Sequence, residues 1–161
     1  MIILGIDPGY AIVGIGVLEY KGNSFRPLEY NAITTHASEM TSLRLKRIKE
    51  DIQEYLHKYK PDAVAIEELF FNNNAKTAIL VAQARGVLVA EVAAAGIPIY
   101  EYTPLQIKQA VTGYGRAEKG QIQQMVKMLM HMTEIPKPDD AADAIAIAIC
   151  HSQWLLTAKP I

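Results

Sequence analysis

The chain opens with Met1-Ile2-Ile3-Leu4-Gly5-Ile6-Asp7, an apolar run that ends in a carboxylate and is followed by the turn signal Pro8-Gly9. A short apolar run bounded in this way predicts a buried β-strand. Two further strand patterns occupy residues 12–20 and 24–33, and the sequence Lys21-Gly22-Asn23 between them predicts a hairpin turn. We therefore expect the chain to begin with an antiparallel meander of three strands.

Helices and strands alternate over the rest of the chain. An amphipathic helix is predicted from about residue 38 to 59 by the helical spacing of Leu43, Leu45, Ile48, Ile52 and Leu56. Further strands are expected at 63–67 and 97–101, and further helices at 75–95, 104–111, 119–132 and 139–156. This order predicts one α/β domain over residues 1–161 with a mixed central sheet, because the chain is too short for two full domains.

The charges of the chain nearly balance, but the acids are unevenly distributed. Sixteen Lys and Arg against 17 Asp and Glu give a net charge of -1, which alone argues against a nucleic-acid partner. Three short clusters hold six of the acids, which leaves 16 positive against 11 negative charges elsewhere: Asp7, Glu67, Glu68, Asp139, Asp140 and Asp143. A basic body around a concentrated acidic pocket is typical of a metal-dependent phosphodiesterase.

Four of these carboxylates are expected to converge on one pocket. Asp7 ends the first strand and Glu67 the fourth, so both project at one edge of the sheet if these strands are parallel neighbours. Asp140 and Asp143 are three residues apart, which places them on one face of a helix. Carboxylate oxygens suit Mg²⁺ or Mn²⁺, and two such ions can activate water for phosphodiester hydrolysis.

Each of these acids also has a structural interpretation. Asp7 can serve as a turn former, and Asp139 or Asp140 as a helix N-cap. For Asp143 and Glu67 this interpretation is weaker, because Asp143 lies between two alanines of an apolar helix and Glu67 is followed by a like charge. We assign Asp139 to the N-cap and Glu68 to solvent.

Four segments of the chain, taken in this order, resemble the crossover junction endodeoxyribonuclease RuvC family, the bacterial Holliday junction resolvases. These segments are Gly5-Ile6-Asp7-Pro8-Gly9, Ala65-Ile66-Glu67, Gln83-Ala84-Arg85-Gly86, and residues 140–148, Asp140-Ala141-Ala142-Asp143-Ala144-Ile145-Ala146-Ile147-Ala148. The resemblance covers nearly the whole chain in register. An aspartate, proline and glycine after a strand is a weak signal alone, but the four segments together are specific.

The resemblance implies a ribonuclease H-like fold, a five-stranded mixed sheet flanked by helices. It implies two Mg²⁺ per subunit, replaceable by Mn²⁺, with four catalytic acids that bind them: Asp7, Glu67, Asp140 and Asp143. The implied reaction is a pair of symmetric nicks in two like-polarity strands of four-way junction DNA during recombination and repair, leaving 5′-phosphate and 3′-hydroxyl ends. The implied partners are a second copy of the chain, contacted through residues 75–95, and the RuvA–RuvB branch-migration complex. On the residues alone, a core helix is an equally good interpretation of 75–95.

A glycine-rich stretch, residues 113–120, mixes glycines with Arg116 and Lys119 just before a helix. Such a stretch can bring backbone amides and cations to a phosphate, although a solvated loop is the alternative. The resemblance places Lys108 and Lys119 near the scissile phosphate and makes Phe70 a stacking aromatic, whereas we expect Phe71 to pack in the core. The chain departs from the family pattern at Tyr10 and Gly120, where small polar residues are usual.

Three other functions compete with a junction nuclease. A sugar kinase or actin-like ATPase shares the first glycine-bearing segment but needs a second half that 161 residues cannot hold. A ribonuclease H-like enzyme that cuts RNA would keep the acids and change the binding loops. A junction-binding module without catalysis does not explain four intact acids.

A cytoplasmic protein without a membrane span is expected. No export signal is recognisable at the start of the chain, and the apolar stretch 75–95 is interrupted by Lys76, Gln83, Arg85 and Glu91. Cys150 is the single cysteine, so it cannot form an internal disulfide and should pack as a small apolar side chain.

Overall fold

The computed structural model describes residues 1–69, 75–155 and 157–161 and confirms the predicted α/β fold with a five-stranded mixed sheet. The strands are β1 (Ile2–Asp7), β2 (Ile12–Lys21), β3 (Ser24–Thr34), β4 (Ala63–Glu67) and β5 (Ile99–Tyr102). The helices are α1 (Thr41–Tyr59), α2 (Ala75–Ala94), α3 (Pro104–Thr112), α4 (Lys119–Leu129) and α5 (Asp139–Trp154).

The sheet has the strand order β3-β2-β1-β4-β5. The first three strands form the expected antiparallel meander, whereas β4 runs parallel to β1 and β5 parallel to β4. Gly22 and Asn23 connect β2 to β3 with positive φ angles of 55° and 63°, a pair that suits the tight turn of a twisted hairpin. The parallel arrangement brings the carboxyl ends of β1, β4 and β5 to one edge of the sheet.

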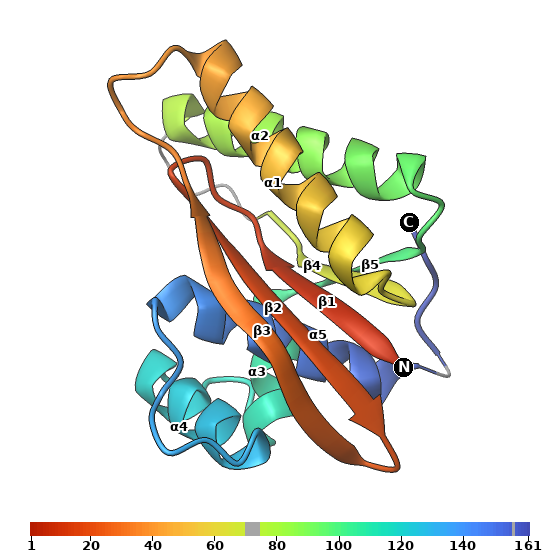
Figure 1. The fold of residues 1–161 in the computed structure, drawn as a ribbon. Coiled ribbons are helices and arrows are strands. Elements are labelled where there is room, and N and C mark those ends of the chain that lie inside the picture. Colours follow the sequence, from red (N-terminus) through yellow and green to blue (C-terminus); the bar gives the residue numbers. More distant parts are fainter. Residues whose placement is uncertain (70–74, 156) are drawn as a thin grey trace.

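Two helical layers cover the sheet (Figure 1). Helices α1 and α2 lie on one face, and α3, α4 and α5 lie on the other. Side chains of successive strand residues point to opposite faces, so Ile3 belongs to the core under α5 while Leu4 and Ile6 belong to the core under α1 and α2. Each face of the sheet therefore has its own hydrophobic core.

Helix α5 approaches the sheet very closely because three glycines lie beneath it. A Cβ atom built on Gly5 would lie 2.0 Å from the carbonyl oxygen of Ala144, and one on Gly14 would lie 2.1 Å from that of Asp140. A Cβ on Gly16 would lie 2.6 Å from the backbone nitrogen of Ile145. Only hydrogen fits at these positions, so the glycines hold the first turns of α5 against β1 and β2.

Helix α1 differs from its prediction in its first turn. It begins at Thr41 rather than near residue 38, and its buried stripe is Arg44, Ile48, Ile52 and Leu56, each four residues from the last. Leu43, which we expected on the apolar face, is 47% exposed, whereas Arg44 is only 8% exposed. The expectation for Leu43 is wrong because the stripe follows i+4 spacing and places an arginine where an aliphatic residue was assumed.

Helix α2 lies on the surface of the chain, so its interpretation as a central core helix is wrong. Ala84, Leu88 and Val92 form a buried stripe, but only 17% of the segment Thr77–Ala94 is buried. This segment is long and apolar enough to cross a membrane by length and composition alone. Its charges, however, join it to the rest of the fold, since Arg85 pairs with Glu101 and Glu91 pairs with Lys49 at 3.7 Å.

Candidate active site

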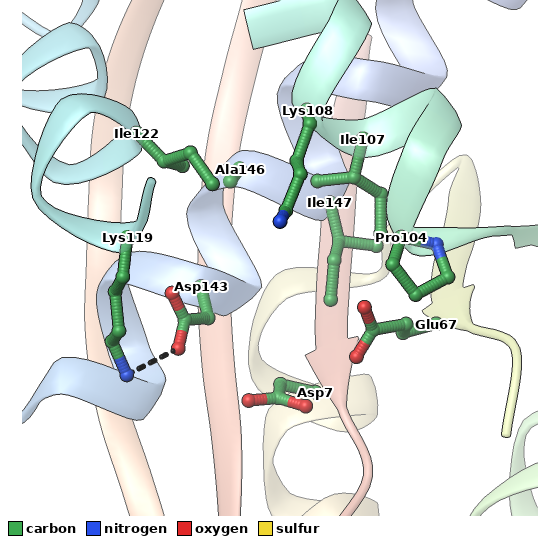
Figure 2. A pocket seen from close by; sticks show the side chains of 10 residues that line it. All are labelled: Asp7, Glu67, Pro104, Ile107, Lys108, Lys119, Ile122, Asp143, Ala146 and Ile147. Carbon is green, nitrogen blue, oxygen red and sulfur yellow. Dashed lines mark ion pairs between the residues drawn. The ribbon is translucent and has the colours of Figure 1, made fainter. Parts of the chain in front are cut away.

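Asp7 and Glu67 end two neighbouring parallel strands, as predicted. The register pairs Ile6 of β1 with Ile66 of β4, so the two acids occupy the next position on each strand at the same edge of the sheet. Both line a pocket with a volume of about 200 Å³, and Figure 2 shows their carboxylates facing each other across it. The prediction that the two strand ends meet is confirmed.

Helix α5 brings the other two acids to this edge. Asp143 lines the pocket together with Asp7 and Glu67. Asp140 lies about one helical turn earlier, in the first turn of α5, where its carbonyl oxygen packs against Gly14 of β2. Three of the four predicted acids therefore share the pocket wall, whereas Asp140 is not among the lining residues, although its charge raises the pKa of Asp7.

The pKa of Asp7 is raised to about 7. Burial is the largest cause, and repulsion from the carboxylates of Glu67, Asp143 and Asp140 adds to it, while Lys119 acts in the opposite direction. Bringing like charges together in a partly desolvated site disfavours ionisation. This edge of the sheet therefore carries an excess of negative charge that a bound cation would relieve.

The pKa values of the two neighbouring carboxyls are also raised. Burial is the main cause for Glu67, followed by repulsion from Asp143, and Lys108 partly offsets both. Burial likewise raises the pKa of Asp143, although the ammonium of Lys119, 3.0 Å away, lowers it. That same hydrogen bond raises the pKa of Lys119, so the lysine stays charged.

The predicted DNA contacts fall at different distances from the pocket. Lys108 on α3 and Lys119 at the start of α4 both line it, and Figure 2 shows the Lys108 side chain directed into it. Arg116 is exposed on the loop between α3 and α4, outside the pocket lining. Phe70 and Phe71 lie outside the described residues. Lys108 and Lys119 are thus the two cations that the fold brings to the acids.

One predicted role in this region is wrong. Asp139 is the first residue of α5 rather than its N-cap, which is Pro138. The Asp139 carboxylate is largely exposed and lies 3.8 Å from the Lys119 ammonium. Pro138 at the cap position has an extended backbone, so the helix begins at Asp139 itself, one residue earlier than an N-cap at Asp139 would place it.

Sequence reasoning did not identify the apolar wall of the pocket. Its members are Pro104, Ile107, Ile122, Ala146 and Ile147, contributed by α3, α4 and α5. Apolar walls lower the local dielectric and strengthen the interactions between the charged groups. These residues look like ordinary core residues of their helices, and the sequence carries no signal that they line a charged site.

The acids suit a hard divalent cation by their chemistry and charge. Oxygen-only ligands are those that Mg²⁺ and Mn²⁺ prefer. Within the part of the chain that the structure describes, no three Asp, Glu, His or Cys side chains are already close enough to hold a metal ion together. Asp7, Glu67 and Asp143 nevertheless line one pocket, and the charges of Glu67 and Asp143 raise the pKa of Asp7, a repulsion that a divalent cation between them would offset.

The sheet order and the acids at the ends of β1 and β4 and on α5 define a ribonuclease H-like α/β protein. The family model described as crossover junction endodeoxyribonuclease RuvC matches residues 3–151. The curated RuvC of Ruminiclostridium cellulolyticum is 59% identical over 151 residues, which cover 94% of this chain and 91% of that protein. The chain therefore belongs to the RuvC family of endodeoxyribonucleases, which depend on divalent metal ions.

Solved structures agree with this assignment. The structure of Thermus thermophilus RuvC superposes with a TM-score of 0.92 at 38% identity and full coverage of both chains. The same protein solved in complex with a Holliday junction substrate gives a TM-score of 0.92 at 35% identity, again over both full chains. The yeast mitochondrial Holliday junction resolvase, at 15% identity and a TM-score of 0.66 over 94% of this chain and 79% of its own, shares the fold.

Proposed function

We propose that this protein is a Holliday junction resolvase, a metal-dependent endonuclease that nicks two like-polarity strands of a four-way DNA junction. The observation that carries the proposal is the pocket in which Asp7, Glu67 and Asp143 lie beside two lysines, in a chain of the RuvC family. The products are a 5′-phosphate and a 3′-hydroxyl, ends that a ligase can join.

Asp7, Glu67, Asp140 and Asp143 are the residues that would hold two Mg²⁺ ions, with Mn²⁺ as a substitute. When bound, such a pair supplies a more acidic water and stabilises the charge on the leaving oxygen. The four carboxylates contribute negative charge at the strand ends and on α5. The raised pKa values of Asp7, Glu67 and Asp143 support this assignment, because a nearby cation would favour the ionised form of each group.

The lysines have a separate role in binding the substrate strand. Lys108 and Lys119 enter the pocket from α3 and α4, so they can contact the phosphate that lies over the acids. Arg116 lies on the loop between α3 and α4 and would contact a phosphate other than the one that is cut. Phe70 would stack on an unpaired base.

A cleavage assay with matched variants tests these assignments. The substrates are a synthetic four-way junction, a linear duplex and an RNA–DNA hybrid, each with and without Mg²⁺. We expect paired symmetric nicks in the junction alone, lost without Mg²⁺ and lost in Asp7→Asn or Asp140→Asn while junction binding persists. Cutting of the hybrid with an intact junction would instead establish a ribonuclease.

Asp139→Asn is the matched control for Asp140→Asn. The two aspartates are adjacent in the sequence, but Asp139 is exposed at the surface and pairs only at 3.8 Å with Lys119. We expect this variant to cut at a rate close to that of the unchanged protein. Equal loss of cleavage in both variants would contradict the assignment of Asp140 as a ligand.

The protein acts as a homodimer formed through α2. The outer face of this helix is apolar and exposed, with Ile79 60% accessible, although the buried stripe already anchors the helix to the sheet. A two-fold dimer also presents two equivalent sites to the two equivalent strands of a junction. A second copy of the same helix is therefore the occupant that suits this face.

The mass in solution tests the dimer. Ile79→Asp should convert the dimer to a monomer that still binds Mg²⁺ but no longer makes paired nicks. Met128→Asp places the same charge on α4 at a position that is equally exposed, so it should remain dimeric. A monomeric unchanged protein at micromolar concentration would contradict this proposal.

The RuvA–RuvB branch-migration complex is the partner that family membership suggests, and the cytoplasm is the compartment in which the chromosomal substrate lies. Resolution of a junction by this protein should accelerate when RuvA and RuvB drive branch migration through it. If adding RuvA and RuvB leaves the rate of junction resolution unchanged, this complex is not a partner of the protein.

A further inference from the structure

Arg44 is a buried cation that lies outside the acidic pocket. It occupies the first turn of α1, and its side chain is more than nine-tenths buried. Across residues 1–69, 75–155 and 157–161, no carboxylate oxygen lies within 4.0 Å of its guanidinium group. Burial of a charge without a counterion is costly, so the contacts that Arg44 does make are informative.

These contacts are made with two residues, Tyr10 and Thr35. The guanidinium carbon lies 3.7 Å from the centroid of the Tyr10 ring, a cation–π arrangement that partly replaces a counterion. Nη2 donates to the Tyr10 carbonyl oxygen at 3.4 Å, and Nε donates to Oγ1 of Thr35 at 2.8 Å. The arginine therefore covers the tyrosine ring and also holds its backbone.

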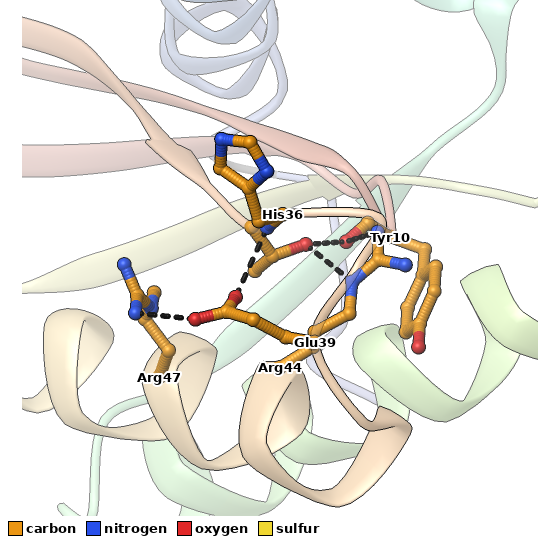
Figure 3. Close-up of polar contacts among 6 residues, drawn as sticks. Tyr10, His36, Glu39, Arg44 and Arg47 are labelled. Carbon is orange, nitrogen blue, oxygen red and sulfur yellow. Dashed lines mark hydrogen bonds and ion pairs between the residues drawn. The ribbon is translucent and has the colours of Figure 1, made fainter.

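The surrounding hydrogen bonds tie the same loop to two more elements, and Figure 3 shows how Arg44 lies beside Tyr10. Thr35 Oγ1 donates to the Tyr10 carbonyl oxygen at 2.7 Å, and the Thr35 backbone nitrogen donates to the Ala11 oxygen at 2.9 Å. The Tyr10 hydroxyl donates to Oγ1 of Thr41, the first residue of α1, at 3.0 Å. Residues 8–11, the loop between β1 and β2, are thus fixed to the end of β3 and the start of α1.

This loop connects two parts of the acidic site. On one side it follows Asp7 directly, and on the other it leads into β2, where Gly14 packs against both the Asp140 carbonyl oxygen and the Asp7 side chain. A shift of the loop would therefore change the position of Asp7 relative to α5. Arg44 reaches the site only through this backbone, because the pocket is lined from the other face of the sheet.

We propose that Arg44 is a positioning residue for junction cleavage, which clamps Tyr10 and thereby fixes the loop that places Asp7 against α5. The inference rests on the proposed function, since it assigns a role in the same site. It predicts that loss of Arg44 weakens metal binding and slows cleavage but leaves the affinity of the protein for junction DNA unchanged.

Arg44→Met removes the charge and the hydrogen bonds while keeping an unbranched side chain of similar length. We expect a cleavage rate under single-turnover conditions at least tenfold lower, and a Mn²⁺ dissociation constant several-fold higher by calorimetry. The dissociation constant for the junction, measured in Ca²⁺, should stay within twofold. Arg44→Lys should recover only part of the loss, because an ammonium cannot cover the ring and donate in two directions.

Arg47→Met is the matched control. Arg47 lies three residues further along α1, and its half-exposed guanidinium pairs with Glu39 at 2.7 Å on the surface (Figure 3). Its removal should change neither the rate nor Mn²⁺ binding. All rates are to be measured at least 15 °C below the melting temperature of the variant.

Thr35→Val is a second variant, for use if Arg44→Met does not fold. It deletes the hydroxyl that links Arg44 to the Tyr10 carbonyl and leaves the arginine in place, so it should lower the rate and Mn²⁺ affinity in the same direction. The proposal is overturned if folded Arg44→Met behaves as Arg47→Met, or if junction affinity falls in parallel with the rate. Should the unchanged protein fail to cut junctions, the proposed function fails, while the Mn²⁺ measurements still decide the role of Arg44.

Discussion

The ammonium nitrogen of Lys119 lies 3.0 Å from a carboxylate oxygen of Asp143, at the point where α4 begins and α5 passes over the sheet. This ion pair lowers the pKa of an acid that burial would otherwise raise further. It also places a cation beside the proposed metal ligands. Lys119 therefore affects the ionisation of the site and also lies where we propose that it contacts a phosphate.

Lys119→Met should shift the pH dependence of cleavage. Without the ammonium the pKa of Asp143 rises, and a site that needs ionised carboxylates then requires a higher pH. We expect the acid limb of log(kcat/KM) to move about one pH unit higher, with Lys119→Arg close to the unchanged protein. Lys127→Met, on the last turn of α4, serves as control. An unmoved acid limb in Lys119→Met would show that Asp143 does not limit the reaction at low pH.

Asp7→Asn should stabilise the metal-free protein while abolishing cleavage. The pKa of Asp7 in the folded protein is about 7, against an ordinary value of 3.8. The unfolded chain therefore ionises first, and the stability of the fold falls as pH rises from about 4 to 7 and stays lower above. In EDTA at pH 8 we expect the free energy of unfolding to increase by about 2 kcal/mol, below the limit of about 4 kcal/mol that the pKa difference sets.

Urea denaturation at two pH values checks this effect. The gain from Asp7→Asn should be smaller at pH 5, where the folded wild-type side chain is still protonated. Glu134→Gln, which neutralises an exposed acid, should change the stability little at either pH. A destabilised Asp7→Asn at pH 8 would contradict the repulsion inferred from the pocket.

Gly14→Ala tests the close approach of α5. The added Cβ would lie 2.1 Å from the Asp140 carbonyl oxygen, so the helix has to move away from β2. We expect a loss of about 2–3 kcal/mol in the free energy of unfolding and a strong loss of cleavage. By contrast, Gly120→Ala meets no atom within 4 Å in α4 and should gain up to about 1 kcal/mol. Thermal unfolding of both variants is the measurement, and equal stabilities would refute the packing argument.

His151 should make the protein sensitive to acid independently of the pocket. Burial lowers its pKa to about 4, and its Nδ1 lies in hydrogen-bonding contact with the Tyr102 hydroxyl at 2.7 Å. The unfolded chain takes up the proton near pH 6.5, so stability present above that pH is lost as pH falls towards 4, by up to about 3 kcal/mol. Between pH 7 and 4.5, the free energy of unfolding of His151→Leu should depend less on pH than that of the unchanged protein. Parallel plots of the free energy of unfolding against pH for the two proteins would contradict this prediction.

Much of the fold could be predicted because local chemistry and tertiary packing agree. The apolar strand ending in Asp7, the Gly22-Asn23 turn and the strand ending in Glu67 each carry a local signal, and the parallel pairing of β1 with β4 brings the two acids together. Asp143 was also predictable, because a charge within an apolar helix needs a partner or a ligand.

Other features depend on contacts that no local pattern encodes. Arg44 is buried because Tyr10, 34 positions earlier, offers a ring and a carbonyl. The apolar wall of the pocket comes from three helices, and its residues look like ordinary core in the sequence. Similarly, the exposure of α2 could not be predicted, because composition alone does not distinguish a core helix from an apolar helix at the surface of the fold.

The close packing of α5 on β1 also determines when the site exists during protein synthesis. Asp7 on β1 precedes Asp143 on α5 by more than a hundred residues of chain, so the two acids are synthesised at different times. At roughly 5–20 residues per second, about 10 s separates the two on the ribosome. Until α5 has been made, a nascent chain carries the acids of the strands without those of α5, so the proposed four-acid site cannot yet form.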